Sequence, residues 1–407
     1  MPTHIPIQHP ELELLSPAGD YERLVMAVQY GADAVYLAGR EFGMRAAAAN
    51  FDNDTLIRGV EYAHRAGVRV YVTCNTLPRE DELQRLPEYL AFLQAAGVDA
   101  LIIADLGVLS LAKKYAPHVK KHVSTQLGVV NSATANFLYD QGADTVVLAR
   151  ELSLDEIRLI RVNTPKDLRL EAFVHGAMCV SFSGRCLLSN YLADRDANRG
   201  QCAQPCRWKY HLVEETRPGE YFEISEDKGT YILNSNDMRM IEHLPELIDA
   251  GITSFKIEGR MKSAYYTAII TNAYRHAIDA ALLGEPLDPV WIAETEKVSH
   301  RNYSTGFFFG YPGQHYGSSS YSQTADIVAV VESCDEEGNA LLTQRNRFFA
   351  GDILELMNPD TVPVSFRADH LTDEDGQEIP DTHRAMMPFR MKLPMPVPPF
   401  TIIRKSR

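Results

Sequence analysis

The chain has 407 residues, of which 45% are hydrophobic and 23% are charged, so it can bury a large core and is not wholly disordered. It has no run of eighteen apolar residues, which excludes a transmembrane helix. Its first residues lack the pattern of a secretory signal, so we expect a cytoplasmic protein without membrane contact. Because the formal net charge is −14, a nucleic acid would have to bind a local basic patch.

A repeated phrase predicts the architecture of the first two thirds of the chain. A glycine, usually followed two residues later by Asp, precedes a short apolar run at 31–37, 97–103 and 142–148. The glycine suits the left-handed position that ends a helix, and the apolar run suits a strand buried on both faces. Amphipathic stretches precede these glycines. Helices and buried strands therefore alternate, which is typical of an α/β protein.

Eight such strands are predicted, which favours a closed (β/α)8 barrel of the TIM type over an open doubly wound sheet. No GxGxxG fingerprint follows any of these strands, which argues against the open alternative. The eight predicted strands are Leu12–Ser16, Ala34–Ala38, Arg69–Cys74, Ala100–Ala104, Lys121–Thr125, Thr145–Ala149, Leu168–His175 and Ser254–Glu258.

The last barrel strand comes late, because an insertion at 176–240 precedes it. Within the insertion, residues 211–233 alternate polar and apolar side chains and predict β structure. We therefore expect a barrel domain at 1–316, insertion included, and a small all-β, barrel-like domain at 317–407. The proline-rich tail at 386–403 is expected to run extended over the surface. The predicted strands of the second domain are Val328–Glu332, Ala340–Thr343, Ile353–Leu356 and Val364–Arg367.

Four of the six cysteines, Cys179, Cys186, Cys202 and Cys206, lie close together directly after a predicted barrel strand. In a cytoplasmic chain this clustering indicates a metal site rather than disulfides. Thiolates suit zinc or an iron–sulfur cluster. The spacing lacks two CxxC pairs, which weakens a structural zinc site, but both metals stay open.

Polar residues follow the predicted strands, where a barrel carries its function. Arg150 and Arg260 each come after a buried run, and the guanidinium fork clamps carboxylates or phosphates. We therefore predict that they bind an anionic small molecule. An internal ion pair of Arg150 with Glu258 is the alternative. His175 and Glu258 are the predicted catalytic residues, as groups that transfer protons.

The insertion is locally basic, since five cations and only two acids lie between residues 175 and 210. Such an island on an acidic protein can meet a phosphate backbone, and we predict that Arg185 and Arg207 bind substrate there. Tyr191 and Trp208 are candidates for stacking on bases. A solvated charged loop is the alternative interpretation.

The segment Glu171–Ser189 resembles the signature of the collagenase-like peptidases of unassigned catalytic type, peptidase family U32. The resemblance extends from about Leu12 to Glu355, nearly the whole chain. Within the family, the chain is most similar to the bacterial tRNA uridine 5-hydroxylation proteins that use prephenate. Further matching segments lie at 13–19, 31–36, 124–126, 150–153, 255–260 and 300–306.

The resemblance implies a 4Fe–4S cluster held by Cys179, Cys186, Cys202 and Cys206. It also implies oxygen-independent 5-hydroxylation of the wobble uridine of tRNA, with prephenate as co-substrate. We expect tRNA as a partner and leave open a second family member or an electron donor. Relatives act on ribosomal RNA or in ubiquinone synthesis, so the substrate is not fixed. The alternatives are a collagenase-like peptidase, for which the chain shows no recognisable protease site, and a zinc-stabilised RNA-binding protein without catalysis.

Overall fold

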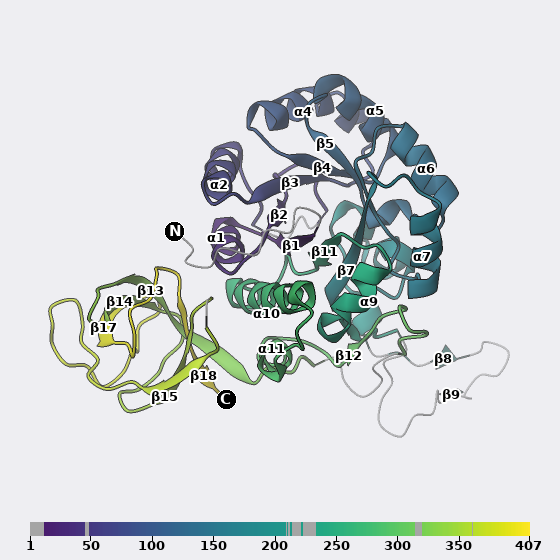
Figure 1. Ribbon diagram of the computed structural model, residues 1–407. Coiled ribbons are helices and arrows are strands. Elements are labelled where there is room, and N and C mark those ends of the chain that lie inside the picture. The colour runs from purple at the N-terminus through teal and green to yellow at the C-terminus, as the bar shows by residue number, and fades with distance from the viewer. Residues whose placement is uncertain are drawn as a thin grey trace.

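The computed structural model describes residues 12–44, 49–208, 210, 212–213, 221–222, 233–313, 320–359 and 361–407. Eight parallel strands form a closed barrel, because β11 pairs with both β1 and β7 (Figure 1). This confirms the (β/α)8 barrel, and all eight predicted strands are present. The barrel strands are β1 (Glu13–Pro17), β2 (Ala34–Leu37), β3 (Arg69–Cys74), β4 (Ala100–Ile103), β5 (Lys120–Val123), β6 (Thr145–Val147), β7 (Arg169–Ala177) and β11 (Ser254–Ile257).

Helices surround these strands, and most begin at a residue whose side chain caps the first turn. Asp20, Asp105 and Ser263, for example, each accept a backbone N–H three residues downstream, which satisfies a donor that the helix leaves open. The helices are α1 (Tyr21–Gln29), α2 (Asn53–Arg65), α3 (Glu80–Leu83), α4 (Leu86–Ala95), α5 (Leu106–Tyr115), α6 (Ser132–Asp140), α7 (Leu154–Val162), α9 (Leu244–Asp249), α10 (Ala264–Leu283) and α11 (Pro289–Thr295).

The repeated glycines lie between a helix and the next strand, as the sequence predicts. Gly31 has φ +97° and Gly142 has φ +87°, in the left-handed region that favours glycine. A Cβ at Gly31 would also lie 2.6 Å from Cγ of Arg275, a side chain of α10. The glycine thus lets the chain turn sharply into a buried strand.

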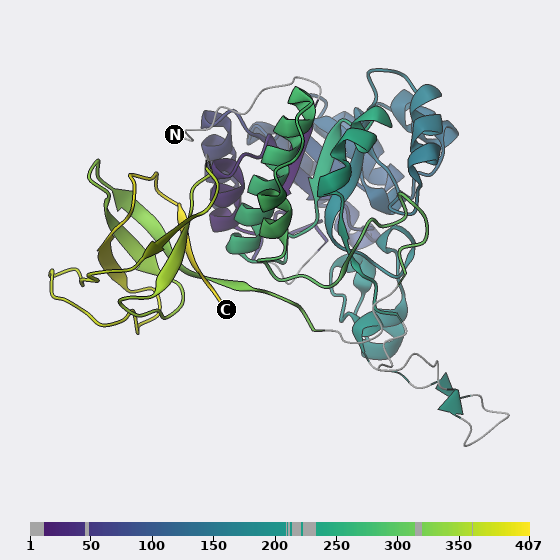
Figure 2. The ribbon, with the colours of Figure 1, turned by 60° about the horizontal axis from the view of Figure 1, so that its bottom comes forward.

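The insertion between β7 and β11 lies at one end of the barrel (Figure 2). Strand β10 (Asp237–Arg239) pairs antiparallel with β7 and parallel with β12 (Tyr303–Ser304), so it ties the insertion to the barrel sheet. Of the predicted β structure at 211–233, β8 (Leu212–Val213) pairs with β9 (Tyr221–Phe222), and most of the rest lies outside the described residues. The insertion's short helices are η2 (Phe182–Gly184), α8 (Leu188–Ala193), η3 (Ala197–Arg199) and η4 (Pro205–Arg207).

A six-stranded antiparallel sheet forms the C-terminal unit, and its order is β16-β15-β18-β13-β14-β17. The four predicted strands are present. The expectation for the tail was wrong, because residues 386–403 supply all of β17 and the first two residues of β18, and β18 lies inside the sheet. The prolines are compatible with this pairing, since Pro388 opens an edge strand and the others lie between strands. The strands are β13 (Ala325–Cys334), β14 (Asn339–Gln344), β15 (Ile353–Met357), β16 (Val364–Arg367), β17 (Pro388–Lys392) and β18 (Ile402–Ser406).

The C-terminal unit packs beside α1, α10 and α11 (Figure 1). Tyr30 of α1's C-terminal end donates its hydroxyl to Met357 O (2.9 Å) and accepts from Ile402 N–H (3.1 Å). Arg404 is buried and binds Glu294 of α11. No helix within the described ranges combines the length and apolar character that a membrane crossing requires.

Candidate active site at the barrel mouth

A cavity of about 580 Å³ lies between the carboxyl ends of the barrel strands and the insertion. Strands from most of the barrel contribute to its floor, and the segment from residue 177 to residue 207 covers it. A site in this place agrees with the general position of function in such barrels. The floor includes Tyr36, Thr73, Ile102, Ser124, Val147, Phe173 and Lys256.

All four clustered cysteines line this cavity, and each is a free thiol. Three of the sulfurs accept a backbone N–H from two residues downstream, which stabilises a thiolate and is the kind of bond that tunes a metal–thiolate site. These bonds run from Ser181 N to Cys179 Sγ (3.4 Å), from Leu188 N to Cys186 Sγ (3.4 Å) and from Gln204 N to Cys202 Sγ (3.3 Å).

The donor set fits a soft metal group. Burial raises the pKa of the Cys206 thiol to about 11 and also raises the pKa of Cys179, with Arg207 and Arg150 respectively acting in the opposite direction. Within the part of the chain that the structure describes, no three His, Cys, Asp or Glu side chains converge on a position for one ion. A 4Fe–4S cluster takes one thiolate for each iron, and the four cysteines that line the cavity provide that number of thiols.

Arg260 and Arg150 both line the cavity, together with Glu258. Arg260 is 4% exposed, and its Nη1 donates to Thr73 Oγ1 at 3.1 Å. Arg150 donates to Ala177 O (2.9 Å) and lies 3.7 Å from Glu258 Oε2. The structure therefore shows the alternative ion pair for Arg150, while Arg260 presents a buried cation at the cavity wall.

The two other predicted substrate-binding arginines, Arg207 and Arg185, lie in different places. Arg207 lines the cavity and donates to Asn234 Oδ1 at 2.7 Å. Arg185 is exposed and lines a separate groove on the insertion, where Tyr191 is 82% exposed. The structure thus groups Arg207 with Arg150 and Arg260, but not Arg185.

His175 lies outside the cavity lining. A bulge in β7 places both Val174 and His175 against Ile257, which interrupts the alternation that starts at Phe173. The ring of His175 instead lies near hydroxyls of Tyr274 (3.3 Å) and Tyr303 (3.5 Å). Burial holds the pKa of His175 well below its usual range. The structure therefore does not bring it together with Glu258 as a catalytic pair.

Sequence reasoning missed two lysines of the cavity. Lys256 donates to Glu171 Oε1 at 2.7 Å, and its Nζ lies 4.7 Å from the ring centroid of Tyr36. Lys262 donates to Ser299 O at 2.8 Å, and burial lowers its pKa. The signal for Lys256 was a charged residue inside an apolar strand, because such a charge is buried only with a partner.

The sequence model of peptidase family U32 matches residues 19–317, and the model of the peptidase family U32 C-terminal domain matches 323–404. The chain is 38% identical over 403 residues to tRNA hydroxylation protein P1 of Bacillus subtilis, which covers 97% of this chain and 95% of that protein. It is 40% identical over 306 residues to the Escherichia coli 23S rRNA 5-hydroxycytidine C2501 synthase (73% and 45% covered). It is 33% identical over 313 residues to a Porphyromonas gingivalis collagenase (74% of each).

Proposed function

Since the chain belongs to peptidase family U32, whose model matches residues 19–317, we propose that it is an RNA hydroxylase acting on tRNA. The observation that carries this proposal is the 38% identity to tRNA hydroxylation protein P1 along 97% of the chain. The name of the similar E. coli synthase also describes a hydroxylated RNA base. We propose 5-hydroxylation of the wobble uridine, without molecular oxygen, as the reaction.

We propose that Cys179, Cys186, Cys202 and Cys206 hold a 4Fe–4S cluster, with zinc as the alternative. Four free thiols around one cavity and the N–H bonds to three of them support this assignment. When bound, the cluster would supply electron-transfer or Lewis-acid chemistry beside the cavity.

We propose prephenate, a dicarboxylate, as the co-substrate. Arg260 and Lys262 follow β11 and both line the cavity, so they would bind its carboxylates through charge-assisted hydrogen bonds. Glu258 also lines the cavity and is the group that we assign to proton transfer. Arg150, which pairs with Glu258, would hold that carboxylate in place.

The RNA would approach from the insertion. A base inside a stacked loop has to leave its stack to reach an enclosed cavity. On the outer groove, exposed Arg185 would meet phosphate and exposed Tyr191 would stack on a neighbouring base. This division separates the residues that bind the co-substrate from those that bind RNA.

Deletion of the gene, in a strain without a second copy, tests the proposed function. Mass spectrometry of tRNA nucleosides should show that 5-hydroxyuridine and its derivatives are lost. The wild-type gene should restore them, and a Cys202→Ser gene should not, because a ligand of the cluster is removed. An unchanged level of 5-hydroxyuridine in the deletion strain would contradict the proposal.

A peptidase is the second candidate, because a relative is named collagenase. The geometry does not favour it. The His175 ring lies against tyrosine hydroxyls, and burial raises the pKa of the Cys179 thiol, so these two residues do not form an activated nucleophile. We expect no cleavage of denatured collagen by the purified protein. Cleavage that Cys179→Ser abolishes without loss of bound metal would support the peptidase.

A further inference from the structure

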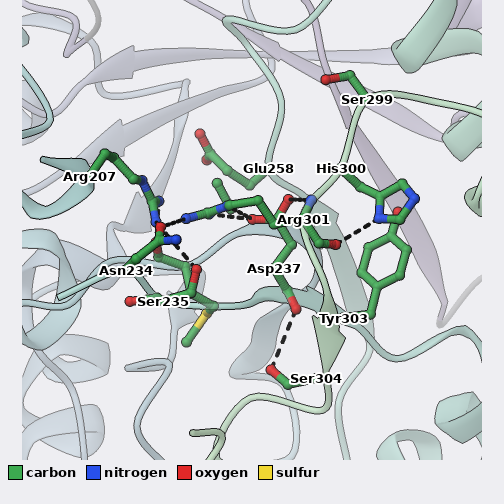
Figure 3. Close-up of polar contacts among 12 residues, drawn as sticks. Arg207, Asn234, Ser235, Asp237, Glu258, Ser299, His300, Arg301, Tyr303 and Ser304 are labelled. Atoms are coloured by element: carbon green, nitrogen blue, oxygen red, sulfur yellow. Dashed lines mark hydrogen bonds and ion pairs between the residues drawn. The ribbon is translucent and has the colours of Figure 1, made fainter. Parts of the chain in front are cut away.

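Two arginines from distant parts of the chain converge on one amide oxygen (Figure 3). Asn234 Oδ1 accepts from Arg207 Nη1 at 2.7 Å and from Arg301 Nη1 at 3.0 Å. Asn234 and Arg301 are almost completely buried. Arg207 is partly buried. Two cations this close together, one of them buried, are unfavourable without a nearby source of negative charge.

Asp237 supplies that charge. It binds Arg301 directly, and it lies near enough to Arg207 for that guanidinium to act against the rise in the pKa of Asp237 that burial causes. The Asp237 carboxylate accepts from Arg301 Nε at 3.0 Å, from Arg301 Nη2 and from the backbone N–H of Arg301 at 3.1 Å. Asp237 itself begins β10, which pairs with β7 next to the barrel mouth. Arg301, Asp237 and Asn234 therefore form a fixed polar unit attached to the barrel sheet.

Arg207 extends from this unit to the cysteines. Its Nη2 donates to the carbonyl oxygen of Met178 at 3.2 Å, and Met178 directly precedes Cys179. Arg207 itself directly follows Cys206. A single guanidinium thus connects the chain beside the first clustered cysteine to the chain beside the last, and connects both to Asn234.

Among the described residues, no carboxylate contacts Arg207 directly, and Asp237 acts on it only from a distance. Within the described ranges no ion pair is formed by Arg207, and its buried Nε has no hydrogen-bond partner there. The side chain lines the same cavity as the four thiols. A cluster ligated by four thiolates carries net negative charge, which would add to the countercharge that Asp237 provides from a distance.

We propose that Arg207 is a positioning residue for the cysteine-bound cluster, held in place by Asn234, Arg301 and Asp237. It fixes Cys179 relative to Cys206, and its positive charge stabilises the cluster, most of all when the cluster is reduced. This inference rests on the proposed 4Fe–4S cluster. It adds residues that do not bind the cluster themselves but hold its cysteine ligands and adjust its potential.

The test reconstitutes the full-length protein anaerobically with ferrous iron and sulfide. Iron bound per chain, the visible absorbance and the midpoint potential are measured for the wild type, Arg207→Met, Arg207→Lys and Asn234→Ala. We expect Arg207→Met and Asn234→Ala to lose about 10-fold or more in cluster affinity, and Arg207→Met to shift the potential to a more negative value. Arg207→Lys keeps the charge and should keep a potential closer to that of the wild type.

Arg404→Met is the matched control. Arg404, like Arg301, is a buried arginine paired with a carboxylate, but it lies in the C-terminal sheet and not beside the cysteines. This variant should be less stable and still bind the full amount of iron. Equal iron and equal potentials in wild type, Arg207→Met and Asn234→Ala would overturn the inference alone. An equal loss of bound iron in Arg404→Met would also overturn the inference. A wild-type protein that binds no iron would overturn both the inference and the proposed cofactor.

Discussion

Arg260 shows how one side chain joins the fold to the proposed chemistry. It is buried, it binds Thr73 of β3, and it lines the cavity. We expect Arg260→Met to raise the KM for prephenate by about 10- to 100-fold, because a charged hydrogen bond contributes about 1.5–3 kcal/mol. Steady-state hydroxylation of undermodified tRNA, normalised to bound iron, measures this. Arg260→Lys should recover part of the loss, whereas an unchanged KM in Arg260→Met would contradict the role.

His175 leads to a prediction about pH. Burial lowers its pKa in the folded protein, so below about pH 6.5 the unfolded chain binds a proton that the folded protein does not. The free energy of unfolding should therefore fall as the pH decreases from about 6.5. His175→Gln should show a weaker decrease in urea titrations between about pH 6.5 and pH 4. His370→Gln, at an exposed position, should behave like the wild type; equal slopes in all three proteins would contradict the prediction.

At the scale of elements, the barrel was predictable because each strand carries its own signal. A left-handed glycine and a short apolar run identify β2, β4 and β6 without knowledge of their neighbours. Strand β10 has only three residues and depends on Asp237 binding Arg301, which follows 64 residues later in the chain. The clustering of the cysteines was visible in the sequence, because the four residues lie within one short segment. The bulge that turns His175 away and the convergence on Asn234 depend on tertiary contacts, so the sequence alone did not show them.

The insertion is also fastened to the barrel by a surface ion pair. Arg199 of η3 binds Glu82 of α3 with two bonds, at 2.7 and 2.6 Å, and this bonding lowers the pKa of Glu82 to about 2. We expect Arg199→Ala to increase hydrogen exchange in the insertion at pH 7. The wild-type contact should weaken as the pH falls from about 4.5 toward 2, because Glu82 then takes up a proton.

The same exchange experiment includes its control. Arg158→Ala removes more exposed ion pairs of α7, with Asp155 and Asp249, and should leave exchange in the insertion unchanged. Global stability should change by about 1 kcal/mol at most in either variant, since exposed pairs contribute little. Unchanged exchange in Arg199→Ala would show that the pair does not hold the insertion.

At the scale of the whole molecule, the net charge of −14 restricts where the proposed RNA substrate can bind. Since most of the surface repels a polyanion, binding should depend on the insertion and weaken with salt. We expect Tyr191→Ala to weaken tRNA binding by about 10- to 100-fold, as stacking on one base contributes about 1–3 kcal/mol. Fluorescence anisotropy at several salt concentrations measures this. Tyr311→Ala removes a tyrosine that is 75% exposed and does not line the outer groove, and this variant should bind as the wild type does. Equal binding by both variants would contradict the assignment.

The two units of the molecule share buried charge, which should make them unfold together. Arg404 donates to Glu355 of β15 at 2.7 Å and to Glu294 of α11, and its side chain is fully buried. Arg404→Met would leave Glu294 buried without this partner, at a cost of about 3–5 kcal/mol. Calorimetry should show one transition for the wild type and a lower or divided transition for the variant. Arg407→Ala breaks an exposed pair within the C-terminal sheet and should retain the wild-type profile. If Arg404→Met also melts as the wild type does, the shared arginine does not couple the units, and apolar contacts between them must account for their cooperation.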